Sequence, residues 1–512
     1  MVCQMDIDNE EYESFHNTLS IEPSSSQEAD AIESTPLSNG ETNNNKSPTS
    51  GGGGGGATVF QTSLNVGKMC MGPGTLALPF AAENGGLIFN IIGLASIGLW
   101  NYYSADCLLR CLKFLPQIDV VNNDAAEVKE VKSIFELEQQ PLYGAIDSTD
   151  CRNKEQTKPE YDRMESMPPP PNGTTTYGAI AWYAIGPKGL MVLDLLMLSL
   201  FFGLLIAYEV AMQGFINDTP LTTGSKRADL IIPSAIIAMI ACAPDMSFLA
   251  KFSGMGLLAV ILSFVVISWQ GIQKYGFSGF SSASDLNQWP ASLSAASSWF
   301  GVVVFGFGVA PFLFNFRDSM ADPKQAGLVL QIALSMVYVG YIAMSNGILV
   351  LFSPGGHIFE GDVLEAMPNT WISTVVRLLM AFAVMVSAPL IVVPFGELME
   401  GKIGIDKAKY SPMFKRIAVR VTFCIICTLV AEFFGSAFVH IVSFIGCFSV
   451  SITSFVLPSL FIIQLSNQSK SDRKGGLGVD LVLLCDTLML VVGVIATVIT
   501  STLTFRELMA TT

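Results

Sequence analysis

Residues 65–86, NVGKMCMGPGTLALPFAAENGG, begin and end like a membrane helix but carry Gly72-Pro73-Gly74-Thr75 at the centre. Glycine in a helix interior costs about 1 kcal/mol relative to alanine, and proline costs about 3 kcal/mol. Proline also lacks a backbone donor and clashes with the preceding turn. Unpaired backbone groups are tolerated inside a bilayer only where they are buried in protein or line a polar cavity. The stretch therefore predicts a broken membrane helix with a binding site at its break.

The composition is that of a polytopic membrane protein. Of the 512 residues, 51% are hydrophobic and 14% are charged, whereas soluble domains average about 25% charged residues. The net charge of −15 is divided between residues 1–56, with a balance of −9, and residues 115–176, with a balance of −6. We expect a disordered acidic tail over 1–57 and a transmembrane domain over 58–505 with a disordered inserted loop over 115–176. Acidity confined to these segments gives no reason to expect a nucleic-acid partner.

Hydropathy predicts eleven membrane spans and an all-α fold. With the N-terminus in the cytoplasm, twenty-one lysines and arginines fall on the cytoplasmic side and four on the other, which fits the positive-inside rule. Residues 177–189 are too short to span and predict an amphipathic helix on the inner membrane surface. The expected spans are 60–82, 86–114, 189–215, 229–244, 249–273, 297–316, 325–352, 371–398, 413–434, 437–463 and 478–503.

A second interruption follows five spans after the first. The sixth span contains Gly306-Phe307-Gly308-Val309-Ala310-Pro311. Many transporters are built from inverted repeats whose corresponding helices are interrupted by glycine or proline near the midplane. Two interruptions five spans apart therefore predict a five-plus-five inverted repeat with one extra helix at the end.

The first span resembles that of the amino acid/auxin permease family, with the pattern N-x-x-K-x-x-x-G-x-G-x-L-x-L-P-x-A. Pro73 and Thr75 depart from that pattern, which bears on substrate preference rather than on fold. Further similarities lie before the third span and in the eighth and tenth spans, and the resemblance covers about residues 58–503. The matching residues of the first span are Asn65, Lys68, Gly72, Gly74, Leu76, Leu78, Pro79 and Ala81.

The resemblance implies a leucine-transporter-like fold and amino acid transport. Such a protein would be a symporter that moves amino acids by alternating access, coupled to H⁺ or Na⁺, with no other cofactor. It would be an integral multi-pass protein of the plasma membrane or of a vacuolar or lysosomal membrane, with its N-terminus in the cytoplasm. Its partners would be the amino acid substrate and the lipid bilayer; the sequence does not indicate an oligomeric state.

The residues alone give a consistent substrate site. Half-helix amides after Thr75 would hold a carboxylate at the positive end of a helix dipole. Free carbonyls near Gly306 would accept from an ammonium group, and Gly308 would leave room for the substrate side chain. Tyr208 would cap the cavity, and Gly72 and Gly74 would complete the site. The alternative is that these glycines only allow close helix packing.

Two further residues are candidates for ion coupling. In the fold implied by the resemblance, Ser387 in the eighth span would ligate Na⁺; the alternative is a serine bonded to its own helix. Glu209 is a candidate proton relay or, alternatively, a carboxylate that reaches the interface. We expect no metal site, because Cys424 and Cys427 lie in an apolar helix without a second ligand pair.

Other classes of function fit the sequence less well. A channel would show a pore loop or a charged ring, and an enzyme would cluster Ser, His and carboxylates at catalytic spacing; neither pattern is present. We therefore expect no enzymatic activity. An amino acid-sensing receptor on the same fold remains the main alternative, because the acidic tail could engage a partner.

Overall fold

A computed structural model gives the fold of residues 57–116, 167–171, 173–242, 247–281, 283–355, 363–364, 370–403, 413–435, 437–468 and 477–511. The described chain is helical throughout, apart from a β-bridge that pairs Ala57 with Met320. In this bridge the Ala57 N–H donates to the Ser319 carbonyl at 2.8 Å, and the Ala321 N–H donates to the Ala57 carbonyl at 3.1 Å. Residues 1–56 of the expected acidic tail and almost all of the expected inserted loop lie outside the described residues, so their disorder stays a prediction.

The first span is broken where glycine and proline predict it. Helix α1 (Val59–Cys70) ends before Met71, and a single turn of tight helix, η1 (Pro73–Ala77), leads into α2 (Leu78–Gly85). Gly86 then turns the chain with φ +82°, a conformation that side chains with a Cβ rarely adopt. Helix α3 (Leu87–Cys111) follows and ends in the short turn η2 (Leu112–Phe114).

The short segment before the third span forms a separate helix, as predicted, and its place on the inner membrane surface stays a prediction. Helix α6 (Thr176–Ile185) buries most of its side chains against α7 (Pro187–Asn217) and α19 (Leu457–Gln468). The Tyr177 hydroxyl donates to the Thr453 carbonyl at 2.6 Å, and the Gln468 amide donates to the Ala184 carbonyl at 3.1 Å. An apolar stretch can be buried by protein as well as by lipid, and here protein covers it.

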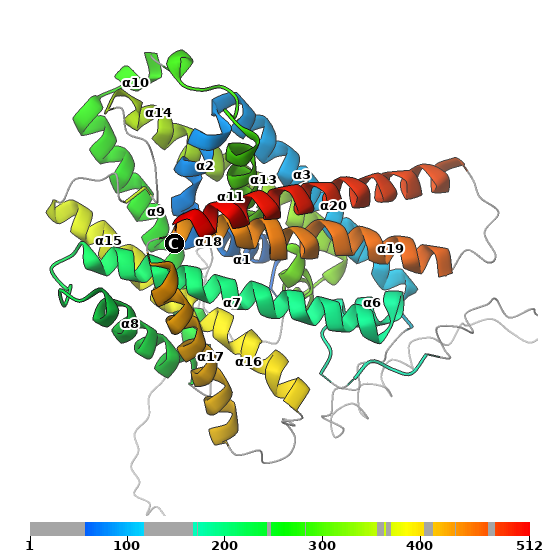
Figure 1. The fold of residues 1–512 in the computed structure, drawn as a ribbon. Helices are drawn as coiled ribbons and strands as arrows, with labels where there is room; N and C mark the ends of the chain where they lie inside the picture. The colour runs from blue at the N-terminus through cyan, green and yellow to red at the C-terminus, as the bar shows by residue number, and fades with distance from the viewer. Residues whose placement is uncertain are drawn as a thin grey trace, which may run out of the picture. The chain divides into compact units, whose positions relative to one another are not determined.

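Helix α7 is the support for one group of helices. Helices α8, α16 and α17 pack beside α7, while α9 packs along α15 (Figure 1). Ion pairs connect these helices near their ends: Lys402 to Asp194 at 2.5 Å and Arg416 to Glu400 at 2.9 Å. The helix bounds are α8 (Lys226–Ala241), α9 (Ser247–Tyr275), α10 (Ser278–Ser281), η3 (Ala283–Asp285), α15 (Trp371–Ser387), α16 (Pro389–Ile403) and α17 (Met413–Phe434).

The sixth span is also broken, as predicted. Helix α11 (Leu293–Gly306) stops at Phe307, and the chain resumes as η4 (Ala310–Phe312) and α12 (Leu313–Asp318). The seventh span contains a wide π turn, a feature that is frequent at functional sites. Its parts are η5 (Pro323–Gln325), α13 (Ala326–Ile342), the π turn η6 (Ala343–Gly347), α14 (Ile348–Phe352) and η7 (Ser353–Gly355).

The last two spans lie side by side (Figure 1). The tenth consists of α18 (Phe438–Ile445), the π turns η8 (Gly446–Val450) and η9 (Ile452–Val456), and α19. It crosses α11 where Gly301 faces Gly446, so closely that a Cβ at either glycine would collide with backbone of the other helix. The final helix is α20 (Leu477–Thr511).

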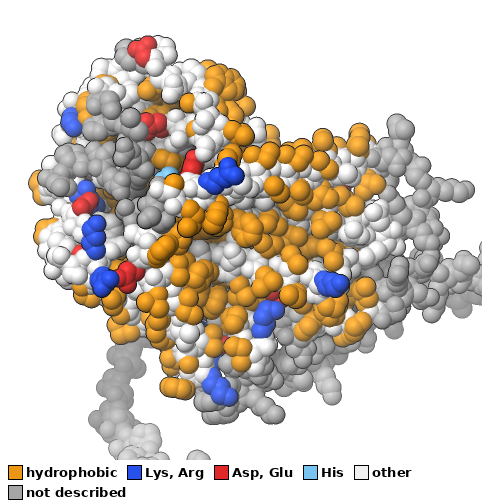
Figure 2. Space-filling view, viewed as in Figure 1, with side chains coloured by type: hydrophobic (Ala, Val, Ile, Leu, Met, Phe, Trp, Pro, Cys, Tyr) orange, Lys and Arg blue, Asp and Glu red, His pale blue; other side chains and the backbone are white. Residues whose placement is uncertain are grey.

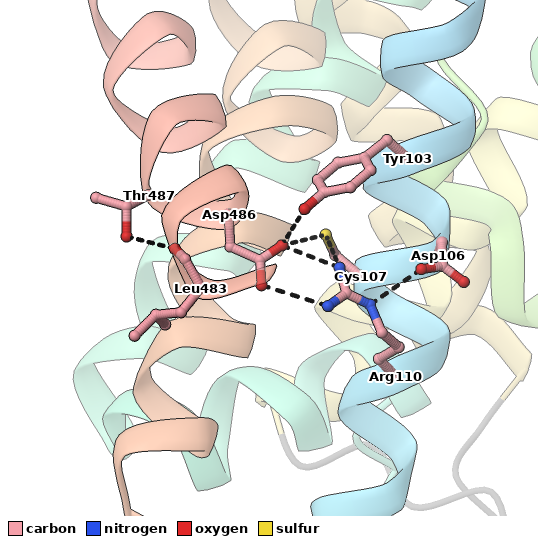
Figure 3. Close-up of polar contacts among 7 residues, drawn as sticks. All are labelled: Tyr103, Asp106, Cys107, Arg110, Leu483, Asp486 and Thr487. Atoms are coloured by element: carbon pink, nitrogen blue, oxygen red, sulfur yellow. Dashed lines mark hydrogen bonds and ion pairs between the residues drawn. The ribbon is translucent and has the colours of Figure 1, made fainter. Parts of the chain in front are cut away.

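Helix α20 is fixed to α3 by a polar cluster (Figure 3). Asp486, 3% exposed, accepts from the Tyr103 hydroxyl at 2.5 Å and from Arg110 at 2.9 Å. Arg110 also pairs with Asp106, one turn earlier on α3, at 2.9 Å. Nearer its C-terminal end, α20 presents Glu507 to the hydroxyls of two serines of α11, Ser294 and Ser298. Polar contacts therefore attach this final helix at two places along its length, at Asp486 and at Glu507.

The molecular surface is suited to lipid. Eight helical segments of the described chain are long and apolar enough to cross a membrane. Hydrophobic side chains cover most of the face shown in Figure 2, including the visible side of α20. The protein is therefore an all-α polytopic membrane protein, as predicted. The count of eleven spans is not confirmed. Helix α8 and the pieces of the first broken segment are each too short to cross a membrane as single helices, and α3, although long enough, is not among the segments that are apolar enough to do so.

Candidate functional site

The two broken segments meet at their breaks. Helix α11 packs against η1 and α2, and α1 contacts α12. Helices α1 and α11 both end here, at Cys70 and Gly306. The last carbonyls of a helix have no partner within the helix and carry the negative end of its dipole. The breaks therefore bring two sets of carbonyl acceptors to one place.

Tyr341 joins the two helix ends. From α13, its hydroxyl lies 2.8 Å from the Cys70 carbonyl oxygen and 2.9 Å from the Gly306 carbonyl oxygen. The side chain is 0% exposed, and its ring meets Phe307 edge-on with centroids 5.0 Å apart. The Cys70 acceptor is thus buried and the Gly306 acceptor partly buried, and both lie within hydrogen-bonding distance of a single donor.

The half-helix after the first break begins two residues earlier than expected. It starts at Pro73, and the Thr75 N–H and hydroxyl donate to the Gly72 carbonyl at 3.0 and 2.8 Å. The Thr75 amide is thus occupied. Pro73 has no N–H, and the Gly74 N–H precedes the first internal hydrogen bond of the turn. The amide suited to an anion is therefore that of Gly74 rather than those after Thr75.

Two of the predicted glycines are in close contact with bulky side chains. A Cβ at Gly74 would lie 2.6 Å from Cε1 of Phe305, and a Cβ at Gly308 would lie 2.7 Å from Cγ1 of Val450. Both distances are shorter than real Cβ contacts. These positions admit glycine because neighbouring side chains already fill the space, which agrees with the close-packing interpretation as well as with the site interpretation.

Tyr208 lies next to the first break, and its role as a cap of the cavity stays a prediction. A Cβ at Gly72 would stand 3.5 Å from its hydroxyl oxygen, an ordinary contact distance. Met71 points the other way, toward α13, where a Cβ at Gly340 would lie 2.7 Å from the end of its side chain. The structure therefore brings Gly72, Gly74, Thr75, Gly306, Gly308 and Tyr208 to the two breaks.

The two ion-coupling candidates lie elsewhere. Glu209, 1% exposed, faces α17 and α8: its Oε1 accepts from the Thr428 hydroxyl at 3.3 Å, and Ser234 lies close by. Its Oε2 makes no hydrogen bond to the described residues. Ser387 ends α15 beside α9, with its Oγ 3.9 Å from where a Cβ of Gly256 would be. Glu209 is therefore a buried carboxylate rather than an interfacial one.

A short piece of chain covers the first break. The Val363 N–H donates to the Leu76 carbonyl of η1 at 3.3 Å. Arg377 of α15, 3% exposed, donates to the Leu364 carbonyl at 3.1 Å and pairs with Asp218 at 3.4 Å. We call residues 363–364 the cover. A buried arginine thus anchors the cover over η1.

A network of polar side chains joins the helices next to the two breaks. The Trp299 indole N–H donates to Asn90 Oδ1 at 2.7 Å, and the Asn90 amide donates to Ser345 and Asn346 in η6. The Asn346 amide donates in turn to the Leu87 carbonyl at 3.0 Å. The network joins α3, α11 and the π turn next to Tyr341, so it fixes the helices on which the site is built.

Sequence reasoning did not identify Tyr341, Phe305, Val450 or Arg377 as site residues. A signal existed for two of them, because a tyrosine and an arginine within apolar spans each need a polar partner. For Phe305 and Val450 no such signal exists, since apolar residues are ordinary in a membrane helix.

Interrupted helices that meet inside an apolar helical bundle define a class, the polytopic transporters with broken helices. Comparison with known families agrees: the chain belongs to the transmembrane amino acid transporter protein family, whose model matches residues 55–128 and 165–505. The resemblance to amino acid permeases is thereby confirmed. The family is one of transporters, which points away from an enzyme.

A relative is known from a plant. The chain is 24% identical over 326 residues to the amino acid transporter AVT1D of Arabidopsis thaliana. The aligned part covers 61% of this chain and 56% of that relative, so the chain spans about half the length of the protein it matches.

Proposed function

We propose that the protein is a secondary active transporter that moves amino acids by alternating access, with the substrate bound between the two helix breaks. The observation that carries this proposal is the meeting of the α1 and α11 ends. In this proposal the carbonyls of Cys70 and Gly306, at the ends of α1 and α11, accept from the substrate ammonium, and the Gly74 amide, in the first turn of η1, donates to the carboxylate.

We infer that H⁺ is the coupling ion and that Glu209 carries it. The neighbours that the structure gives Glu209 are hydroxyls and thiols, from Thr428, Ser234, Cys424 and Cys427. A carboxylate inside a membrane costs at least ~2.5 kcal/mol unless it is paired or wet. Binding a proton removes this cost, so the carboxyl group can load and release H⁺ during a transport cycle. Ser387, as a Na⁺ ligand, is the alternative that the experiment below distinguishes.

The charge distribution supports a cytoplasmic N-terminus, and we include this orientation in the proposal. The membrane is either the plasma membrane or a vacuolar or lysosomal one.

The test is uptake into proteoliposomes. A panel of labelled amino acids is offered under an imposed pH gradient and, separately, under a Na⁺ gradient. We expect uptake of at least one amino acid under the pH gradient. Absence of uptake under both gradients would refute the proposed transport, whereas uptake driven by Na⁺ alone would refute the assignment of H⁺.

Three variants refine this test. Gly74→Val and Gly308→Val should abolish uptake while the protein remains in the membrane; normal uptake by both contradicts the site. Glu209→Gln should lose at least tenfold of pH-driven uptake yet retain exchange of labelled for unlabelled substrate. Glu397→Gln is the matched control, because it removes an exposed carboxylate from α16.

A further inference from the structure

The acceptors assigned to the substrate ammonium are already occupied. In this structure the Tyr341 hydroxyl lies within hydrogen-bonding distance of both, at 2.8 Å from the Cys70 oxygen and 2.9 Å from the Gly306 oxygen. A phenol carries one proton, so it cannot donate fully to two carbonyls at once. The pair of acceptors is therefore under-satisfied by its present donor.

We propose that Tyr341 is a resident substitute for the substrate ammonium: it satisfies the two helix ends while the transporter is empty, and the ammonium displaces it on binding. This inference rests on the proposed function. It assigns to a residue of the seventh span a role in setting affinity and in selecting the substrate head group.

The physical reason is the chemistry of the two donors. Carbonyls left unpaired in a buried site cost about 1–3 kcal/mol each, so an empty transporter needs a donor here. An ammonium brings three N–H donors and a positive charge to the negative ends of two helix dipoles. Charge-assisted hydrogen bonds are stronger than neutral ones. The substrate ammonium therefore displaces the hydroxyl, but the affinity for substrate is reduced because the hydrogen bonds of Tyr341 to the two carbonyls must first break.

Hydrogen bonds hold the backbone around Tyr341, so its side chain is the part that would move. The Tyr341 carbonyl accepts from the Ser345 hydroxyl at 2.6 Å, and Ser345 is in turn bonded by Asn90, so the backbone here is held by the support network. At Gly306 a Cβ would lie 2.7 Å from the Tyr341 hydroxyl, so glycine at this position leaves the hydroxyl its place. The backbone around Tyr341 is therefore held by hydrogen bonds, so displacement of its hydroxyl requires the side chain, packed against Phe307, to move away from the two acceptors.

The test compares exchange kinetics of the wild type with Tyr341→Phe in proteoliposomes. The variant keeps the ring and loses the competing hydroxyl. We expect its KM for the transported amino acid to fall about fivefold, the factor that corresponds to one neutral hydrogen bond of ~1 kcal/mol, with Vmax of exchange within about twofold of wild type. A residue with a merely structural role would lower Vmax without lowering KM.

Tyr338→Phe is the matched control, since it removes the hydroxyl of a half-buried tyrosine on the same helix that makes no hydrogen bond to either acceptor, and its KM should equal that of wild type. An unchanged or raised KM in Tyr341→Phe overturns the inference while leaving the proposed function intact, because wild-type uptake establishes that function separately.

A second measurement uses only the wild-type protein and so does not require that Tyr341→Phe folds. N-methyl, N,N-dimethyl and N,N,N-trimethyl derivatives of the transported amino acid are tested as inhibitors of wild-type exchange. Each methyl group removes one N–H donor, so we expect inhibition to weaken stepwise and the trimethyl derivative to be at least tenfold weaker than the parent amino acid. Equal inhibition by all of them would overturn displacement of Tyr341.

Discussion

The ring of Phe305 lies against Gly74: a β-carbon at position 74 would stand 2.6 Å from Cε1 and 3.0 Å from Cδ1 of that ring. One residue comes from the first break and the other from the end of α11, so this contact measures how closely the two broken segments approach. It also explains why residue 74 has no side chain.

Gly74→Ala should reduce uptake at least tenfold, because overpacking costs about 1–3 kcal/mol and would push the two segments apart. Replacing the ring as well, in Gly74→Ala with Phe305→Ala, should restore part of the lost uptake. Uptake of labelled substrate by membrane vesicles, normalised to the amount of protein, measures both effects. Gly67→Ala in α1 is the control, since a Cβ there has no neighbour within 4 Å. Failure of the double variant to recover any uptake would argue against the contact.

The contact between Gly308 and Val450 allows the same logic on the other side of the site. Gly308→Ala should reduce uptake, because the new Cβ would lie 2.7 Å from Val450 Cγ1. Val450→Ala in the same protein removes that methyl group and should return uptake to within about threefold of the Val450→Ala single variant. Gly327→Ala, with no neighbour within 4 Å, serves as the control. If the losses of uptake in Gly308→Ala and in Val450→Ala simply add in the double variant, the result contradicts the proposed contact.

The contacts of Arg377 allow a prediction of how firmly the cover is held. In Arg377→Met the Leu364 carbonyl loses its donor and Asp218 loses its cation. Hydrogen bonds to charged groups contribute about 1.5–3 kcal/mol, so the cover should detach at least tenfold more often. A cysteine introduced by Leu364→Cys, 2% exposed in the parent protein, should then react correspondingly faster with a maleimide reagent. Arg506→Met, which removes an exposed charge, should leave the labelling rate as it is; equal rates in both variants would exclude the anchor.

The attachment of α20 to α3 predicts a loss of stability. Asp486→Asn removes one of the two carboxylates that pair with Arg110, and the remaining partner, Asp106, is on the same helix as Arg110 (Figure 3). We expect the free energy of unfolding in detergent to fall by about 1.5–3 kcal/mol, seen as a lower midpoint of thermal unfolding. Thr487→Val is the neighbouring control, because the Thr487 hydroxyl bonds the Leu483 carbonyl of its own helix. An unchanged midpoint in Asp486→Asn would show that the cluster does not hold α20.

Features that depend on a short run of residues were predictable. Glycine and proline at 72–75 and 306–311 break helices for local reasons, and the structure has both breaks. The start of the half-helix was misplaced by two residues because the hydrogen bonds of Thr75 to Gly72 depend on the geometry of the turn. Patterns of a few residues therefore locate a break but do not place each amide.

Features that depend on contacts between distant segments were not predictable. Tyr341 reaches Cys70 across 271 positions of sequence, and no periodicity encodes such a distance. Hydropathy does not distinguish burial in lipid from burial in protein, so the packing of helix α6 against α7 and α19 was not predictable either. The hydrogen bond from Asn90 to Ser345 of the π turn η6 likewise joins residues 255 positions apart.

The β-bridge at Ala57 has a consequence for how the two halves of the molecule are connected. It ties the entry of α1 to the exit of α12 through main-chain atoms alone, so changes of side chain at Ser319 or Ala321 leave it in place. Proline at 57 or 321 would break it, since proline lacks the N–H. The start of one broken segment and the end of the other are thus joined by main-chain hydrogen bonds, so we expect a displacement of one to be transmitted to the other.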